Sequence, residues 1–267
     1  MTRPDSPLPA VWAGLFRDTS ALTDSALLDA ALAGMGGPVG SVAVSEDELA
    51  DVLPGSQGVS VHARGGAGVI GGIARLATRH HLALAGIEVS LREEADLAAN
   101  ARRVLAALEA ARTSGDLDHA VPIHLVLPPG PATYGWLGAA DVAGEAELGL
   151  GLRIGTEPDP SIVIGWIDAA LDRELGFVAV DGPTSAVRCA DGRPGFANLL
   201  LATGALWDGD RTEAVRWLSE DDPDSVTRAL AERGDDLLSA RRWVHAIATP
   251  TPSTTTAALE QILNGAL

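Results

Sequence analysis

The most constraining feature of this sequence is an alternation, repeated eight times, of a short apolar segment with a segment of helical periodicity. Most of the apolar segments are hydrophobic throughout, a pattern typical of parallel strands that are covered on both faces. Eight such units predict a (β/α)8 TIM barrel, and because no linker interrupts them we expect one domain over residues 1–267. The expected strands span residues 10–18, 39–44, 58–63, 82–89, 121–127, 150–155, 177–180 and 243–248.

Local signals mark several of the expected helix starts. Capping boxes of the S-x-x-E type follow two of the strands, and an aspartate before a proline marks a third start. The acidic stretch 219–226 is expected to form a surface loop. The residues of these caps are Ser45 with Glu48, Ser90 with Glu93, and Asp159 before Pro160.

The composition excludes several partners and cofactors. A net charge of −17 and a pI near 4.6 argue against nucleic acid and an anionic membrane, because both require a basic face. All 19 basic residues are arginine, as expected of a GC-rich bacterial genome, so no lysine exists for a Schiff base, pyridoxal phosphate or a phosphate loop. The single cysteine, Cys189, excludes an internal disulfide. The absence of an apolar leader or a long apolar window predicts a cytoplasmic protein.

In a TIM barrel the functional groups lie at the carboxyl ends of the strands. The expected strand ends carry acids, bases and cations, although a simpler interpretation exists for several of them. His124 lies within an apolar strand and is typical of a core histidine, and Asp181 before Gly182 can serve to shape a turn. A hard-metal site is an alternative use of His62, Glu88 and Asp181, but no spacing enforces it and we assign no metal. The strand-end residues are Asp18, Ser45, His62, Arg64, Glu88, His124, Arg153, Thr156, Asp181 and Thr249.

Residues 66–71 read GAGVIG and match the G-x-G-x-x-G dinucleotide motif, between an expected strand and a helix. Glu88 then stands where a ribose-binding acid is expected. Three residues separate the strand from the first glycine, and two strand–helix units precede this one, so an NAD(P)-binding Rossmann oxidoreductase is only a distant alternative. Binding of a phosphate by the loop between Gly65 and Gly72 is a second alternative, and we assign no cofactor.

The stretches GLRIGTEPDPSIVIGWIDAAL and LGFVAVDGPTSAVRCADGRPGFANLLLA resemble the carboxyl-terminal half of an uncharacterised bacterial TIM-barrel family. That family carries K-L-R-T-G-G, F-K-A-T-A-G-L-H-H-P-V-R and H-G-F-L-N-V-L-L-A, and its L-F-D-D-A-A-L is similar to GLFRDTSAL here. Its strand-six and strand-seven lysines are similar to those of deoxyribose-phosphate aldolases, so the resemblance implies an aldolase-like barrel. Positions that agree with the family are Glu88, Arg153, Gly155, Gly182, Arg188, Gly195, Phe196 and Asn198.

The family's reactive groups are replaced in this chain. Gly151 and Val178 stand at the lysine positions, Thr184 and Ser185 stand at the two histidines, and Arg17 stands at an aspartate. The strand-five acid falls at Val126. Iminium chemistry is therefore excluded, while the retained acid and arginines suit an anionic small molecule. We assign catalysis to Glu88, Asp181 and His124, and substrate binding to Arg153, Arg188, His62, Thr156, Thr184 and Ser185.

Two functions follow as hypotheses. In the first, the barrel binds an anionic carbonyl metabolite and performs lyase- or isomerase-like acid–base chemistry. In the second, it is a non-catalytic partner or scaffold, a degenerate paralogue in a homo-oligomer or a hetero-oligomer. Trp136, Trp207 and Trp217 on expected helix surfaces suit an association face, or they pack helices against the barrel.

Overall fold

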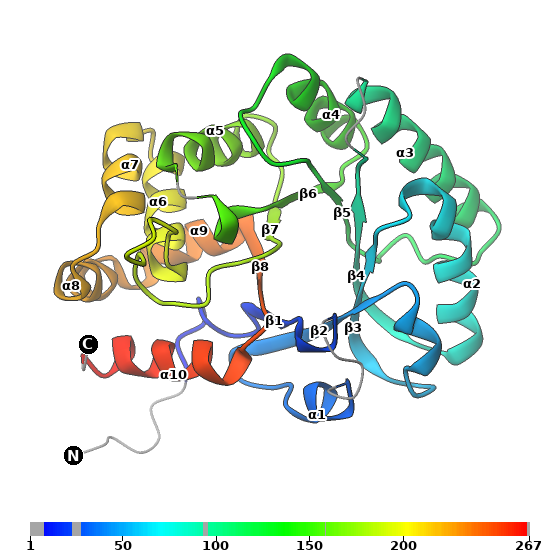
Figure 1. Ribbon diagram of the computed structural model, residues 1–267, viewed down its shortest axis with the longest axis horizontal. Helices are drawn as coiled ribbons and strands as arrows, with labels where there is room; N and C mark the ends of the chain where they lie inside the picture. Colours follow the sequence, from blue (N-terminus) through cyan, green and yellow to red (C-terminus); the bar gives the residue numbers. More distant parts are fainter. Residues whose placement is uncertain (1–7, 23–27, 93–95, 158, 266–267) are drawn as a thin grey trace.

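The computed structural model describes residues 8–22, 28–92, 96–157 and 159–265. Eight parallel strands form a closed barrel in which each strand pairs with the next, and β8 closes the ring on β1 (Figure 1). The prediction of a (β/α)8 barrel is confirmed, and the Rossmann alternative is wrong because that fold requires an open sheet. The strands are β1 Phe16–Asp18, β2 Val39–Ser45, β3 Gln57–Ala63, β4 Ala83–Ser90, β5 Ile123–Val126, β6 Gly149–Leu152, β7 Phe177–Ala179 and β8 Val244–Thr249.

Helices surround this ring and cover the outward faces of the strands (Figure 1). The α-helices are α1 Leu28–Ala33, α2 Ile70–His80, α3 Leu97–Thr113, α4 Tyr134–Glu145, α5 Pro160–Leu171, α6 Phe196–Trp207, α7 Arg211–Ser219, α8 Pro223–Arg233, α9 Leu237–Trp243 and α10 Pro252–Leu263. Short 3-10 turns are η1 Ser20–Leu22, η3 Glu48–Asp51, η4 Gly66–Val69, η5 Ile154–Thr156 and η6 Gly234–Asp236.

The caps expected from the sequence are present at two of the three places. Asp159 accepts a hydrogen bond from the backbone of Ser161 and begins α5. Ser45 and Glu48 bond reciprocally, but the segment they cap is the 3-10 turn η3. The third box is wrong in part: Ser90 ends β4, and α3 begins after Asp96, whose side chain accepts from Ala99 N at 2.8 Å. Glu93, the other member of that box, lies outside the described residues.

The first strand is shorter than expected. Residues 10–14 form turns, and only Phe16–Asp18 pairs with the sheet. Gly14 has a φ of 61° and its N–H donates to Gly37 O, so the chain reverses just before β1. Apolar side chains in a turn segment can therefore imitate a strand when they are buried, as Trp12 is.

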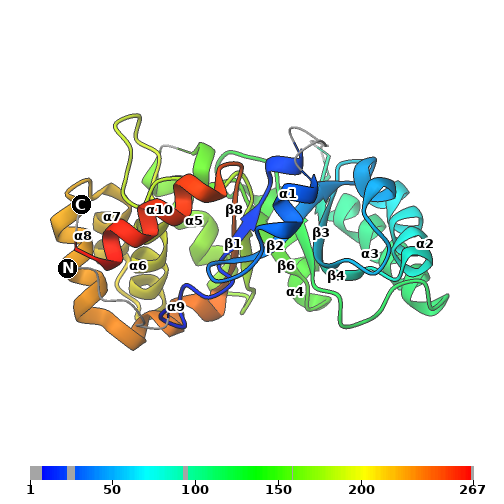
Figure 2. The ribbon, with the colours of Figure 1, turned by 90° about the horizontal axis from the view of Figure 1, so that it is seen from below.

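The connection from β7 to β8 contains four helices and adds a third layer to one side of the barrel (Figure 2). Helix α6 contacts α7, α8 and α9, and every residue from Phe196 to Leu206 is buried. A helix that is apolar on all sides is typical of such an internal position. Only residues 220–222 of the acidic stretch 219–226 form a loop, because Ser219 ends α7 and α8 begins at Pro223 after the cap Asp222.

The barrel interior is divided into an apolar part and a polar part. A separate buried cluster is formed by Val126 of β5, Val178 of β7, Val180 just after β7 and Ala246 of β8. On the other side the interior holds an ion pair between Arg17 and Glu88, both buried. Arg17 Nε also donates to Ser41 Oγ at 3.0 Å. A charged pair in this position is unusual for a barrel core, which is normally filled by branched apolar side chains.

Candidate functional site at the carboxyl-terminal mouth

A cavity of about 470 Å³ opens at the carboxyl ends of the strands. We call it the mouth cavity. The loops after five of the strands and the end of β4 supply its walls, which is the usual construction of an active site in this fold. Its described lining residues are Thr19, Leu22, His62, Arg64, Ser90, Arg153, Gly155, Thr156, Asp181, Gly182, Thr184, Arg193 and Pro250.

Arg153 and Asp181 form an ion pair across this cavity. Their side chains are 30% and 43% exposed, so both remain accessible to a ligand. Asp181 has a φ of 48°, a left-handed conformation that aspartate tolerates better than most residues. At Gly155 a Cβ atom would overlap the carbonyl oxygen of Asp181, so glycine is required for the β6 and β7 loops to meet. The turn-shaping role of Asp181 and its contact with Arg153 therefore coexist.

His62 and Ser90 lie side by side at the ends of β3 and β4. His62 Nε2 is 3.0 Å from Ser90 Oγ, and both residues line the mouth cavity. Burial lowers the pKa of His62 from its ordinary value, and the charges of Arg64 and Arg153 lower it further. Asp181 and Glu46 act in the opposite direction. The lowered pKa favours the neutral imidazole, which can accept a proton.

Arginines gather at the mouth cavity of a strongly acidic protein. Among the described lining residues are three arginines, Arg64, Arg153 and Arg193, and one carboxylate, Asp181. Arg193 Nε donates to the Asp191 carboxylate at 2.8 Å. Two of these arginines are ion-paired, Arg153 with Asp181 and Arg193 with Asp191, so the cavity gathers guanidinium groups whose charge is partly neutralised.

Five of the residues assigned from the sequence lie around the mouth cavity, and two of the proposed substrate-binding residues do not. Arg188 Nη1 donates to Leu218 O at 2.8 Å and so binds the carboxyl end of α7. Ser185 Oγ lies 2.7 Å from Cys189 Sγ, away from the cavity. The five that lie together are His62, Arg153, Thr156, Asp181 and Thr184.

Two of the residues assigned to catalysis lie elsewhere. Glu88 is buried against Arg17; burial raises the pKa of Glu88, and Arg17 offsets part of that rise. His124 is the second residue of β5 and contacts His245, the second residue of β8, with 3.0 Å between Nε2 and Nδ1. Both histidines therefore lie near the amino-terminal end of the barrel, opposite the mouth cavity. Burial lowers the pKa of His124 well below its ordinary value, as expected of a core histidine.

The glycine-rich loop is already occupied by a side chain. The N–H groups of Arg64 and Gly65 donate to the two carboxylate oxygens of Glu46, at 2.9 Å each. These donors would otherwise be the ones offered to a phosphate at the start of the loop. The alternative of phosphate binding by this loop is therefore disfavoured, because an anion would have to displace Glu46.

No cluster of three metal-ligating His, Cys, Asp or Glu side chains occurs in the part of the chain that the structure describes. The alternative ligand set His62, Glu88 and Asp181 is not assembled, because Arg17 holds Glu88. None of the helices in the described ranges combines the length and apolar composition needed to cross a bilayer.

The sequence assignment gave no site role to several lining residues of the mouth cavity, among them Arg64, Ser90 and Arg193. Arg64 was recognised as a strand-end residue but received no role. Ser90 was assigned to a helix cap, although it stands two residues after Glu88 and so projects from the same face of β4. Arg193 lies in the long loop before α6, and a loop has no periodicity from which the position of a side chain can be predicted.

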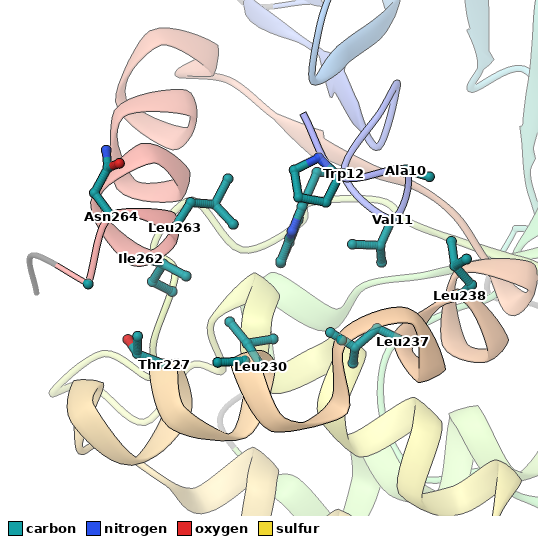
Figure 3. Close-up of a pocket in the computed structure, with 14 residues that line it drawn as sticks. Ala10, Val11, Trp12, Thr227, Leu230, Leu237, Leu238, Ile262, Leu263 and Asn264 are labelled. Carbon is teal, nitrogen blue, oxygen red and sulfur yellow. The ribbon is translucent and has the colours of Figure 1, made fainter. Parts of the chain in front are cut away.

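A second cavity, of about 550 Å³, lies outside the barrel among α8, α9, α10 and the turn before β1 (Figure 3). Trp12, Leu230, Leu237 and Ile262 point into it. No acidic or basic side chain is found among its described lining residues. It therefore offers no group for acid–base chemistry or for holding an anion.

Comparison with known proteins leaves the family open. No protein-family model matches the chain, and no curated protein matches it. One similar solved structure is the carboxyl transferase domain of Rhizobium etli pyruvate carboxylase with pyruvate, at 13% identity and a TM-score of 0.44. The match covers 93% of this chain but only 48% of that one, so the chain spans about half of its length. A likeness at this level supports no statement about what this chain binds.

Proposed function

We propose that the protein binds a small metabolite carrying a carboxylate or a phosphate in the mouth cavity. The observation that carries this proposal is the convergence of Arg64, Arg153 and Arg193 on one cavity of about 470 Å³ in a protein of net charge −17. Guanidinium groups present planar donors that match both anions, and the volume is in the range of small-molecule sites.

Arg153 is the residue best placed to hold the anion. It stands at the carboxyl end of β6, and its partner Asp181 keeps the guanidinium over the cavity while leaving it partly exposed. Placing an arginine here is costly unless its charge is matched. An incoming anion would supply a second opposite charge, and the Thr184 hydroxyl lies at the same rim, whereas the Thr156 hydroxyl donates to Arg153 O at 3.1 Å.

The chemistry that suits this arrangement is proton transfer on an anionic carbonyl compound, of a lyase or isomerase type. His62 is the base in this proposal, in place of the Glu88 expected from the sequence, because His62 lines the cavity and is favoured in its neutral form. Arg153 would stabilise a developing oxyanion. The aldolase-like ancestry implied by the resemblance would then have lost its Schiff-base step.

A second candidate function is that of a non-catalytic partner in a homo-oligomer or with an intact paralogue. Gly151 and Val178 at the lysine positions of the resembled family favour it. Trp207 adds a surface feature, since it is 46% exposed and packs on Trp243, whereas Trp136 and Trp217 are buried. In this case the arginines of the mouth cavity would serve no ligand.

A thermal-shift screen with phosphorylated and carboxylated metabolites tests the proposal. A ligand at 100 times its Kd stabilises the fold by about 2.7 kcal/mol, which raises Tm by roughly 5 to 10 °C in a chain of this size. We expect Arg153→Ala to abolish the shift. Arg211→Ala is the matched control, because Arg211 forms an Arg–Asp pair with Asp168 on the outer surface. If no metabolite raises the Tm of the wild type, the non-catalytic function is favoured.

A further inference from the structure

We propose that Ser90 is a nucleophile activated by His62, and that the mouth cavity hydrolyses an ester of an anionic compound. This inference rests on the anion site proposed above and names a reaction for it. It differs from the lyase- or isomerase-like chemistry because it requires a covalent intermediate on the protein.

The geometry of the pair is the first support. His62 and Ser90 project from the carboxyl ends of the adjacent strands β3 and β4, and the 3.0 Å between Nε2 and Oγ is a hydrogen-bond distance. Both side chains line the mouth cavity, so a ligand held by Arg153 can meet the hydroxyl. A nucleophile and a base within hydrogen-bond reach are the minimal requirement for covalent catalysis of this kind.

The protonation state of the base is the second support. Burial, Arg64 and Arg153 lower the pKa of His62, against the opposing effects of Asp181 and Glu46. A neutral ring with its proton on Nδ1 leaves Nε2 free to accept the hydroxyl hydrogen of Ser90. A histidinium, in contrast, could only donate to Ser90 and would leave the oxygen unactivated.

The surrounding charge is the third support. Arg64 and Arg153 line the same cavity as the hydroxyl. One guanidinium can hold the anionic group of the ester while another faces the oxygen that becomes negative in the tetrahedral intermediate. The site therefore favours esters that carry a carboxylate or phosphate at the acyl end over neutral esters.

The reaction balances with water as the only co-reactant. Ser90 Oγ attacks the acyl carbon and its proton passes to His62 Nε2; the C–O bond to the alcohol then breaks, and the alcohol leaves with that proton. Water next gives a proton to His62 and attacks the acyl-enzyme, and Ser90 Oγ leaves and regains the proton. The products are one alcohol and one carboxylic acid.

The competing explanation is that the hydrogen bond simply ties the ends of β3 and β4 together. A structural bond of this kind would give no covalent chemistry at Ser90. Ser239 provides a comparison: its Oγ in α9 donates to the backbone oxygen of Asp236 at 2.7 Å instead of bonding an imidazole.

Covalent labelling with diisopropyl fluorophosphate tests the inference, with the modified residue located by tandem mass spectrometry. We expect one adduct, on Ser90, that is absent in Ser90→Ala, unchanged in Ser239→Ala and formed at least 100-fold more slowly in His62→Gln. Hydrolysis of 4-nitrophenyl hemisuccinate should exceed that of 4-nitrophenyl propionate, and Arg153→Ala should remove the difference.

Calorimetry with inorganic phosphate on the same samples separates this inference from the anion site. Phosphate binding without any Ser90 adduct would overturn the nucleophile and leave the anion site intact. Labelling of Ser90 at the same rate in His62→Gln would also overturn it, because the base would then have no part. Absence of labelling, of phosphate binding and of any thermal shift in the metabolite screen would refute the two proposals together.

Discussion

The ion pair between Arg17 and Glu88 allows a quantitative test of how the barrel interior is stabilised. The two residues are 5% and 2% exposed, and the pair has few alternative partners, since Arg17 otherwise bonds only Ser41 among the described contacts. Replacing Arg17 with methionine keeps much of the side-chain volume but leaves the Glu88 carboxylate buried and unpaired. We expect the free energy of unfolding to fall by about 3 to 5 kcal/mol.

The double variant Arg17→Met with Glu88→Leu should recover most of this loss. It removes both charges, and replacing a buried ion pair by apolar residues of similar volume is often neutral or stabilising. For a chain of this length, about 2 to 4 °C of Tm corresponds to each kcal/mol, so the single variant should melt roughly 6 to 20 °C lower.

Urea denaturation followed by the fluorescence of the six tryptophans measures these differences. The penalty of Arg17→Met should be smaller at pH 5 than at pH 8. Burial already raises the pKa of Glu88, and removal of Arg17 raises it further, so mild acid neutralises the unpaired group. A loss below 1 kcal/mol, or a double variant that is no better than the single one, would refute this view of the interior.

Three further predictions concern pH and local geometry. The free energy of unfolding should fall as pH drops below about 6.5, because histidines with a lowered pKa stay neutral in the folded protein while the unfolded chain takes up protons. Urea titrations between pH 7.5 and pH 5 measure this fall. His124→Gln should reduce the dependence of the free energy of unfolding on pH. Protonation of Glu88, whose pKa is raised, offsets part of the fall. Gly155→Ala should cost more than 1 kcal/mol, because its Cβ would overlap the backbone after β7, and an unchanged Tm would contradict that contact. Asp159→Ala should lower the Tm through loss of the α5 cap, whereas Asp159→Asn should lower it much less in the same assay. The histidines with lowered pKa are His62, His124 and His245.

The fold was predictable because its signals are local. A continuous apolar run such as residues 121–127 indicates a strand covered on both faces, and eight of them with intervening helices leave few topologies. The prediction failed at two places. The apolar residues before Phe16 are buried in turns and do not form part of a strand, and the short helix α9 was not predicted. Neither error changed the number or order of the strands.

The candidate site was predictable only in part. His62, Arg153 and Asp181 were found because a residue at the carboxyl end of a barrel strand faces the mouth. Glu88 satisfied the same rule only approximately. It lies two residues before the end of β4 and contacts Arg17 in the barrel interior, whereas Ser90 ends the strand and lies at the rim of the mouth cavity. A shift of two residues keeps the same face and moves a side chain about 7 Å along the strand, from the opening into the core.

The order of strands and helices, the absence of lysine chemistry and the excess of negative charge were determined by the sequence alone, because periodicity and composition require no knowledge of contacts. Which side chains meet was decided by the tertiary structure. The pairing of Arg17 with Glu88 joins residues 71 positions apart, and His62 with Ser90 joins residues 28 apart. Such contacts depend on strand register and on the path of the loops. A difference of a few residues in the position along a strand decides whether a side chain joins a buried ion pair or is exposed to substrate.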